Sequence, residues 1–239
     1  MLVAWVLALA ASTDVLTDLE RSSAGIGSFR ARYTLVTSAS PEPTLLEIDY
    51  VAPDRLRFDR TSAGTLTAGN STPLTDGASA VLLASEAWAR SQGLPVQAWL
   101  TFGKAAAVDF VGRDEGLLMA PAYAVPAMLD DAGLTLQDFD FYEIHEAFAA
   151  QVLCTLAAWE SDEFCRTKLK RPAALGSIDR SKLNVNGSSV AIGHPFAATG
   201  ARIVATLAKL LATSPNARRG LISVCTAGGM GVTAILERA

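Results

Sequence analysis

Histidine is scarce in this sequence, and both copies stand where a reactive side chain would be useful. His145 and Glu146 follow the apolar segment 139–144, at the point where a strand is expected to end and a helix to begin. In open α/β sheets, ligands gather at the carboxyl ends of strands, so this pair is well placed for chemistry. The bland alternative for a lone histidine is a capping or core position with its hydrogen bonds satisfied.

The second histidine favours the chemical interpretation. His194 lies between Gly193 and Pro195, in a turn that leads into a helix expected from Thr199. Glycine and proline constrain the backbone on both sides of the imidazole. A histidine framed in this way at a helix start is placed to react rather than only to pack.

Cys225 adds a third candidate. It ends the apolar run 221–225 and opens a glycine-rich turn that includes Ala227, Gly228 and Gly229. Such turns let backbone N–H groups approach a ligand closely, as an oxyanion site requires. A thiol there can be a nucleophile or an acid and base, whereas the commonest role of a free cysteine is that of a small buried hydrophobic residue.

The elements that must position these residues alternate between helices and short apolar strands, which predicts a layered α/β domain. We expect helices over 77–91, 121–132, 147–169 and 199–212, and strands over 96–102, 139–144, 220–225 and 231–236.

The first 60 residues have a different pattern. Apolar residues at helical spacing occur over 15–19, and segments 29–35 and 46–50 alternate apolar and polar residues with period two. This pattern predicts one helix and an antiparallel hairpin, with a domain boundary that divides the chain into residues 1–62 and 63–239. The segment faintly resembles the start of the periplasmic lipoprotein-carrier (LolA-like) family, whose strands line a cavity for acyl chains.

The extreme N-terminus, 2–11, is an apolar run in which Ala8-Leu9-Ala10 could be a small-residue cleavage site. It is typical of a weak signal peptide, although Arg21 is the first basic residue, and a buried strand or helix start fits equally well. The run is far shorter than the roughly 20 residues that span a bilayer. We expect a cytoplasmic protein without a stable membrane span, with export as the alternative.

The amino-acid composition excludes several classes of protein. The chain has 239 residues, a net charge of −4, 50% hydrophobic and 18% charged residues. These values argue against disorder and against nucleic acid as a partner. Its cysteines, Cys154, Cys165 and Cys225, fit neither a disulfide framework nor a zinc site. The sequence therefore indicates a reducing compartment and no metal site.

From about residue 64 onward, the sequence resembles the C-terminal half of the thiolase family. Five stretches carry the resemblance: 67–78 (TAGNSTPLTDGA), 145–149 (HEAFA), 184–187 (NVNG), 193–202 (GHPFAATGAR) and 225–231 (CTAGGMG). The histidine of HEAFA and the GHPFAATGAR stretch are similar to the thiolase subunit of fatty-acid β-oxidation complexes. The resemblance implies an α/β domain with a mixed five-stranded sheet covered by helices on both faces.

The resemblance also implies a reaction. In thiolases, a cysteine of the N-terminal half attacks a 3-ketoacyl-CoA, releases acetyl-CoA and passes its acyl group to a second CoA. By resemblance, His194 would activate that thiol and Cys225 would move a proton at the acetyl α-carbon. His145 would help to hold the enolate oxygen, with Glu146 orienting the network and the N–H near Ala227 stabilising the oxyanion. Coenzyme A would be a substrate, and the resemblance implies no covalently bound cofactor.

Two departures qualify these implications. The family usually has adjacent glycines where this sequence has Gly187 and Ser188, and no cysteine here matches the family's nucleophile. We therefore expect a thiolase-type acyltransferase that lacks the nucleophile-bearing half, with a partner chain or a second copy covering the exposed face. The alternative is a non-catalytic fusion or truncated product with a lipid-carrier-like N-terminus.

Overall fold

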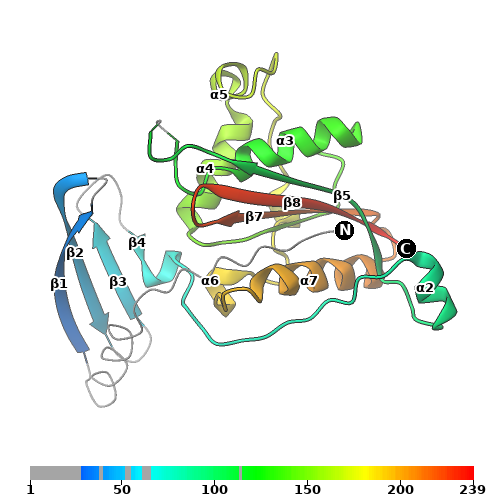
Figure 1. Cartoon of the computed structure of the whole chain (residues 1–239), viewed down its shortest axis with the longest axis horizontal. Helices are drawn as coiled ribbons and strands as arrows, with labels where there is room; N and C mark the ends of the chain where they lie inside the picture. Colours follow the sequence, from blue (N-terminus) through cyan, green and yellow to red (C-terminus); the bar gives the residue numbers. More distant parts are fainter. Residues whose placement is uncertain (1–27, 38–39, 52–54, 61–65, 113–114) are drawn as a thin grey trace. The chain divides into compact units, whose positions relative to one another are not determined.

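The computed structural model describes residues 28–37, 40–51, 55–60, 66–112 and 115–239 (Figure 1). The chain divides into two compact units, Met1–Asn70 and Ser71–Ala239. The apolar run 2–11 and the helix expected over 15–19 lie outside the described residues. No helix in the described ranges is both long and apolar enough to cross a membrane.

The first unit contains one antiparallel sheet of four strands in the order β1-β2-β3-β4. The strands are β1 (Ser28–Thr37), β2 (Ser40–Val51), β3 (Arg55–Arg60) and β4 (Leu66–Thr67), and the short 3-10 helix η1 (Ala68–Asn70) follows them. β1 and β2 pair with Phe29 opposite Tyr50 and Tyr33 opposite Leu46. The likeness to a lipoprotein carrier stays a prediction.

The second unit is built on a mixed sheet with the order β5-β8-β7-β6. Its strands are β5 (Ala98–Ala107), β6 (Phe141–Ile144), β7 (Arg219–Thr226) and β8 (Met230–Arg238). β6 and β7 are parallel, and the other neighbours are antiparallel. The predicted α/β class is confirmed. The sheet has four strands in the described ranges rather than the five that the resemblance implies, and residues 77–84 form no strand.

Helices cover both faces of this sheet (Figure 1). α3 (Pro121–Ala132) and α4 (Ala149–Glu160) enclose one core with the large buried side chains Trp159, Tyr142 and Phe139. α7 (Thr199–Thr213) encloses the other core through Ile203, Leu207 and Leu211. Its buried residues recur every four positions, so one stripe of the helix faces the sheet.

Two predicted helices differ from the structure, and in both cases a serine sets the boundary. The helix expected over 77–91 is only α2 (Glu86–Ser91), because the Ser85 hydroxyl accepts a hydrogen bond from the Trp88 N–H and starts the helix there. The helix expected over 147–169 is divided into α4 and α5 (Asp162–Thr167) at Ser161. That residue has an extended backbone, and its hydroxyl accepts from the Phe164 N–H at 3.1 Å. Serine competes with the helix for backbone hydrogen bonds and so favours caps.

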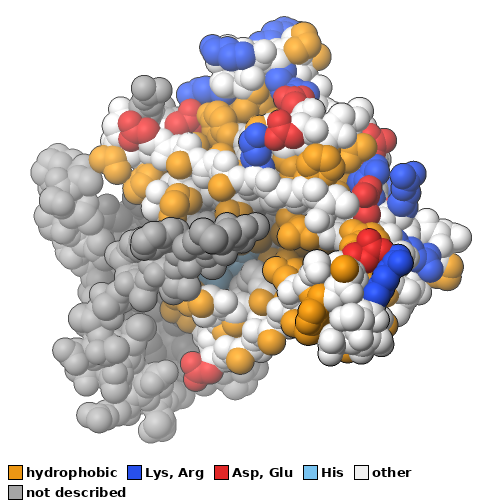
Figure 2. Space-filling model, turned by 45° about the vertical axis from the view of Figure 1, so that its right-hand side comes forward, with side chains coloured by type: hydrophobic (Ala, Val, Ile, Leu, Met, Phe, Trp, Pro, Cys, Tyr) orange, Lys and Arg blue, Asp and Glu red, His pale blue; other side chains and the backbone are white. Residues whose placement is uncertain are grey.

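An apolar groove of about 780 Å³ lies between residues 80–100 and a side of α7 that carries Val204, Ala205 and Ala208. Leu82 and Leu83 in this segment are 71% and 68% exposed. Figure 2 shows hydrophobic side chains recurring over one face of the described surface, with charged side chains more frequent towards its top and right. Exposed apolar surface of this kind is typical of an interaction site.

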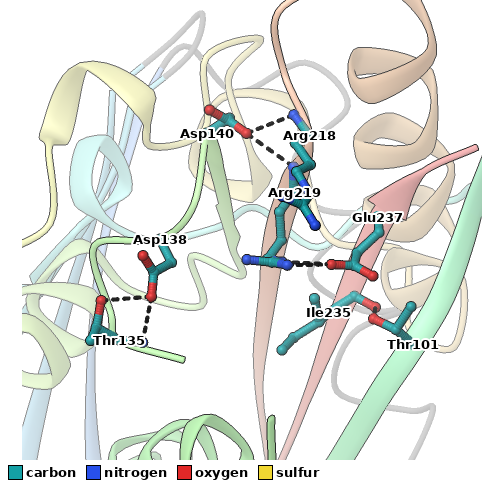
Figure 3. A network of polar contacts seen from close by, with 8 residues as sticks. All are labelled: Thr101, Thr135, Asp138, Asp140, Arg218, Arg219, Ile235 and Glu237. Carbon is teal, nitrogen blue, oxygen red and sulfur yellow. Dashed lines mark hydrogen bonds and ion pairs between the residues drawn. The ribbon is translucent and has the colours of Figure 1, made fainter. Parts of the chain in front are cut away.

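A polar network holds the amino ends of β6 and β7 in line (Figure 3). Asp140, just before β6, accepts hydrogen bonds from the backbone N–H groups of Arg218 and Arg219 at 2.7 and 3.0 Å. The Arg219 guanidinium in turn donates to Glu237 on β8 at 2.7 and 2.5 Å. The register that results places Phe141 opposite Gly220, so the carboxyl ends of both strands meet at one edge.

Gly220 is expected to be intolerant of any side chain. A Cβ built there would lie 2.4 Å from Cδ1 of the fully buried Leu207. We expect Gly220→Ala to lower the free energy of unfolding by about 1–3 kcal/mol, the usual result of overpacking. Gly200→Ala is the matched control, because nothing lies within 4 Å of a Cβ there and alanine favours the helix by about 0.5–1 kcal/mol. Urea unfolding of both variants checks this, and equal effects would contradict it.

Candidate active site

The candidate residues converge on the carboxyl ends of the parallel strands. His145 and Glu146 follow β6 directly, and Cys225 is the penultimate residue of β7. The backbone N–H of His145 donates to the carbonyl of Ser223 at 2.9 Å, which extends the strand pairing by one residue. This bond fixes the first histidine against β7.

His194 reaches the same place from the loop between α6 (Ser189–Ile192) and α7. The centroids of the His145 and His194 rings lie 4.4 Å apart, with the ring planes at 50°. The His194 N–H donates to the Pro73 carbonyl at 2.9 Å. Gly193 has a φ of 93°, and a Cβ there would lie 2.4 Å from Cγ2 of Thr75, so only glycine allows this turn.

His145 is buried and is held as a neutral group. Its Nδ1 lies 2.8 Å from the Ser189 hydroxyl. Burial, followed by the charges of His194 and Arg202, lowers the pKa of His145 to about 4. Desolvation disfavours the imidazolium because a buried cation loses its hydration. The ring is therefore uncharged at neutral pH.

His194 is half-buried and bonds differently. Its Nδ1 lies 2.6 Å from the Thr199 hydroxyl at the start of α7, and the Phe196 ring packs 4.7 Å from its centroid. Burial and the positive charge of Arg202 lower the pKa of His194 below its ordinary value. Nε2 of each histidine has no hydrogen-bond partner within the ranges that the structure describes.

Glu146 makes no side-chain hydrogen bond to either histidine in the described ranges and instead orders the loop that carries His194. Its carboxylate accepts from Nδ2 of Asn184 at 2.7 Å and from the Val190 N–H at 3.1 Å. The Asn184 side chain also bonds the N–H and the carbonyl of Ile144, both at 2.9 Å. Asparagine tolerates its φ of 47° better than most residues do. Glu146 and Asn184 thus tie the end of β6 to the 184–194 loop.

Cys225 is buried, and its thiol bonds a residue of α4. Its thiol donates to Oε1 of Gln151 at 3.5 Å, and no hydrogen bond joins it to His145 or His194 in the described part of the chain. Burial raises the pKa of Cys225 to about 11, against smaller opposing effects of backbone hydrogen bonds. The group is a protonated thiol at neutral pH. Gln151 could not be singled out from the sequence, because it lies within an ordinary helical pattern.

The turn after Cys225 is tight and open to solvent. Gly228 and Gly229 have φ values of 84° and 74°, and a Cβ on Gly229 would lie 2.5 Å from the Val108 carbonyl. Ala227 and Gly228 are exposed, and their N–H groups make no hydrogen bond to the residues described. Unpaired N–H groups in such a turn can receive an anionic oxygen.

Glu143 is the most unusual residue that the motifs did not reveal. It lies on β6 with 1% exposure, and neither carboxylate oxygen has a hydrogen-bond partner among the residues described. Burial raises the pKa of Glu143 to about 7, with Arg202 opposing and Glu146 adding to the rise. An acidic residue inside the buried strand 141–144 was the available signal.

No group of three or more His, Cys, Asp or Glu in the described ranges could hold a metal ion.

Comparison with known proteins shows the family of the chain. The family model for the thiolase C-terminal domain matches residues 100–238. The chain belongs to the thiolase family. It is 50% identical over 184 residues to 3-ketoacyl-CoA thiolases of Yersinia pestis and Yersinia pseudotuberculosis, and these matches cover 77% of the chain. The chain spans about two fifths of the length of these relatives (41%).

Solved thiolases share the fold. The dimeric peroxisomal thiolase of Saccharomyces cerevisiae is 36% identical, with a TM-score of 0.58 over 75% of this chain and 39% of that one. The Acat5 thiolase of Ascaris suum, solved with coenzyme A, is 28% identical, with a TM-score of 0.56 over 76% and 41%. The predicted resemblance to the thiolase C-terminal half is thereby confirmed. The roles of the individual site residues stay predictions.

His145 and Glu143 should affect stability in opposite directions over the same pH range. The folded pKa of His145, about 4, lies below its ordinary 6.5, so acidification from 6.5 to 4 lowers the free energy of unfolding. The folded pKa of Glu143, about 7, lies above its ordinary 4.5, so raising the pH from 4.5 to 7 also lowers the free energy of unfolding. Urea unfolding between pH 4.5 and 7 should therefore show a steeper loss on acidification in Glu143→Gln and a weaker one in His145→Asn. Identical slopes in both variants would refute this.

The raised pKa of Cys225 predicts slow alkylation. Only the thiolate reacts, so at pH 8 iodoacetamide should modify the exposed Cys154 well before Cys225 in the folded chain. The rate at Cys225 should keep rising towards pH 11. Peptide mass spectrometry measures both sites, and the urea-unfolded chain, in which both should react alike, is the control. Equal rates in the folded chain at pH 8 would count against a buried neutral thiol.

Proposed function

We propose that this chain supplies the proton-transfer half of a thiolase active site that cleaves 3-ketoacyl-CoA with coenzyme A. The observation that carries the proposal is the pair of neutral imidazoles 4.4 Å apart at the carboxyl ends of β6 and β7, next to Cys225 and an open glycine turn. The thiolase relatives named above support the substrate class. The nucleophilic cysteine belongs to a thiolase N-terminal half, which none of the cysteines here replaces.

In the first step, Nε2 of His194 accepts the proton of that nucleophilic thiol. The lowered pKa of His194 keeps the ring neutral and able to accept at neutral pH. The thiolate attacks the 3-keto carbon of the substrate, and the oxyanion that forms is stabilised by N–H groups of the Ala227 turn. Covalent catalysis then continues from a tetrahedral adduct.

In the second step, the bond between the α-carbon and the 3-keto carbon breaks, and its electron pair forms the enolate of acetyl-CoA. His145 stabilises the enolate oxygen as a neutral hydrogen-bond donor. Cys225 gives its proton to the α-carbon, a role that suits a thiol whose pKa of about 11 keeps it protonated. Acetyl-CoA leaves, and the Cys225 thiolate takes the thiol proton of a second coenzyme A. The coenzyme A thiolate then takes the acyl group, and the protonated His194 returns its proton to the nucleophilic cysteine as that group leaves.

The exposed apolar segment supports a partner surface. We propose that Leu82, Leu83 and the groove beside α7 are covered in the working enzyme by the nucleophile-bearing half or by a second copy of the chain. The yeast relative is dimeric, which supports an oligomeric assembly. Fatty-acid β-oxidation is the process in which such an acyltransferase would act.

Complementation tests the proposal. The chain is mixed with a separate polypeptide that carries a thiolase N-terminal half, and the loss of 3-ketoacyl-CoA enolate absorbance is followed after addition of coenzyme A. We expect turnover in the mixture, lost by about 10²- to 10⁴-fold in His194→Asn and in Cys225→Ala because each removes a proton-transfer group. Cys154→Ser, at an exposed position, is the matched control and should keep full activity.

Two results would overturn the proposal. One is the absence of thiolysis in a mixture whose two parts are folded and bound to each other. The other is turnover that survives both His194→Asn and Cys225→Ala, because the reaction would then use other groups.

A further inference from the structure

Each imidazole of the site is held by one hydroxyl, and the other partner of that hydroxyl decides which ring nitrogen carries the proton. The tautomer of each ring can be inferred from the hydrogen-bond partners of its nitrogens. A neutral imidazole has one donor and one acceptor nitrogen, and a hydroxyl has a single proton to give. The two histidines differ in this respect.

The Ser189 hydroxyl already accepts a hydrogen bond from a group that can only donate. Nη2 of Arg202 lies 3.1 Å from Ser189 Oγ, and a guanidinium has no acceptor. The other partner of this oxygen is His145 Nδ1, at 2.8 Å. If Nδ1 also donated, the proton of a fully buried hydroxyl would have no acceptor among the described residues, which is costly. Ser189 therefore donates to Nδ1, and the ring proton of His145 is on Nε2.

Thr199 presents the opposite arrangement to His194. Its hydroxyl donates to the Pro195 carbonyl, four residues earlier, at 3.2 Å. With its proton used in this way, Oγ1 accepts at its second contact, His194 Nδ1 at 2.6 Å. The ring proton of His194 is therefore on Nδ1, and Nε2 carries the lone pair.

We infer that Ser189 backed by Arg202, together with Thr199, fixes opposite tautomers in the two histidines, so that His145 presents an N–H donor and His194 an acceptor at Nε2. The inference deepens the proposed function and rests on it for its meaning in the reaction. An acceptor at His194 can take a thiol proton, and a donor at His145 can stabilise an enolate oxygen. With the tautomers exchanged, neither step could occur. Ser189, Arg202 and Thr199 are thus positioning residues.

Two acidic side chains help to keep Arg202 charged beside Ser189. Burial disfavours the guanidinium charge and lowers the pKa of Arg202, whereas Glu143 and Glu146 favour that charge. Arg202 also donates to the Ser188 hydroxyl at 3.4 Å, which anchors it beside the start of α6. Its positive charge disfavours a second proton on His145. The same residue therefore sets the tautomer and adds to the larger effect of burial, which keeps the ring neutral.

Nitrogen NMR tests the inference directly, because the chain has only two histidines. The full chain is labelled with ¹⁵N-histidine, and long-range ¹H–¹⁵N spectra at pH 7 distinguish protonated from bare ring nitrogens. His145→Asn and His194→Asn assign the signals. We expect a bare Nδ1 in His145 and a bare Nε2 in His194. The same tautomer in both rings, or an imidazolium in either, would overturn the inference.

Matched variants show which hydroxyl acts on which ring. Ser189→Ala should move the His145 signals towards the Nδ1–H tautomer and leave those of His194 unchanged. Thr199→Val, which keeps the side-chain shape, should move the His194 signals towards the Nε2–H tautomer and leave those of His145 unchanged. Thr199→Ser keeps the hydroxyl and should give the parent spectrum. If Ser189→Ala does not fold, the parent spectrum and the Thr199 variants still decide. Unchanged His194 signals in Thr199→Val would refute its part of the inference.

These spectra and the complementation assay can fail separately. Opposite tautomers without thiolysis would reject the proposed function and leave the assignment standing. Thiolysis with equal tautomers would keep the function and reject the positioning roles.

Discussion

The parallel pairing of β6 with β7 is the constraint on which the rest of the site depends. Only a parallel pair brings two carboxyl ends to one edge, and here those ends carry His145 and Cys225. The pairing is held at its far end by Asp140, which accepts from two N–H groups at the start of β7. It also requires Gly220, because Leu207 of α7 occupies the space of a side chain. Packing on one face of the sheet therefore supports the geometry at its edge.

His194, in contrast, is positioned by loops that hydrogen bonds hold together. Residues 71–74 pair with 147–148 and with His194 through backbone hydrogen bonds. The Thr72 hydroxyl donates to the Ser189 carbonyl at 2.7 Å, and Glu146 and Asn184 join the loop to β6. The imidazole is placed by many satisfied donors and acceptors, which makes its position specific.

Periodicity and glycine placement were enough to predict the α/β class, helix 121–132 with its exact bounds, and the strand ends that carry the site. They could not predict helix boundaries that depend on one serine, as at Ser85 and Ser161. Nor could they show the partners of the histidines. Ser189 and Arg202 lie far from His145 in the sequence and meet it only through the fold. Glu143 looked like part of an ordinary strand, although a charge in a fully buried segment marks a residue under constraint.

Desolvation explains why one site can hold such different proton affinities. The same loss of water lowers the pKa of His145, raises that of Cys225 and raises that of Glu143, because in each case the charged form is disfavoured. At pH 7 burial thereby keeps His145 and Cys225 neutral and Glu143 about half protonated, and of these four groups only the half-buried His194 retains access to water. A base must accept a proton and release it again within each turnover, which a fully buried imidazole beside Arg202 would resist. The difference in burial between the two adjacent rings is thus a physical reason for the roles that we propose, with His194 as the base and His145 as the neutral donor.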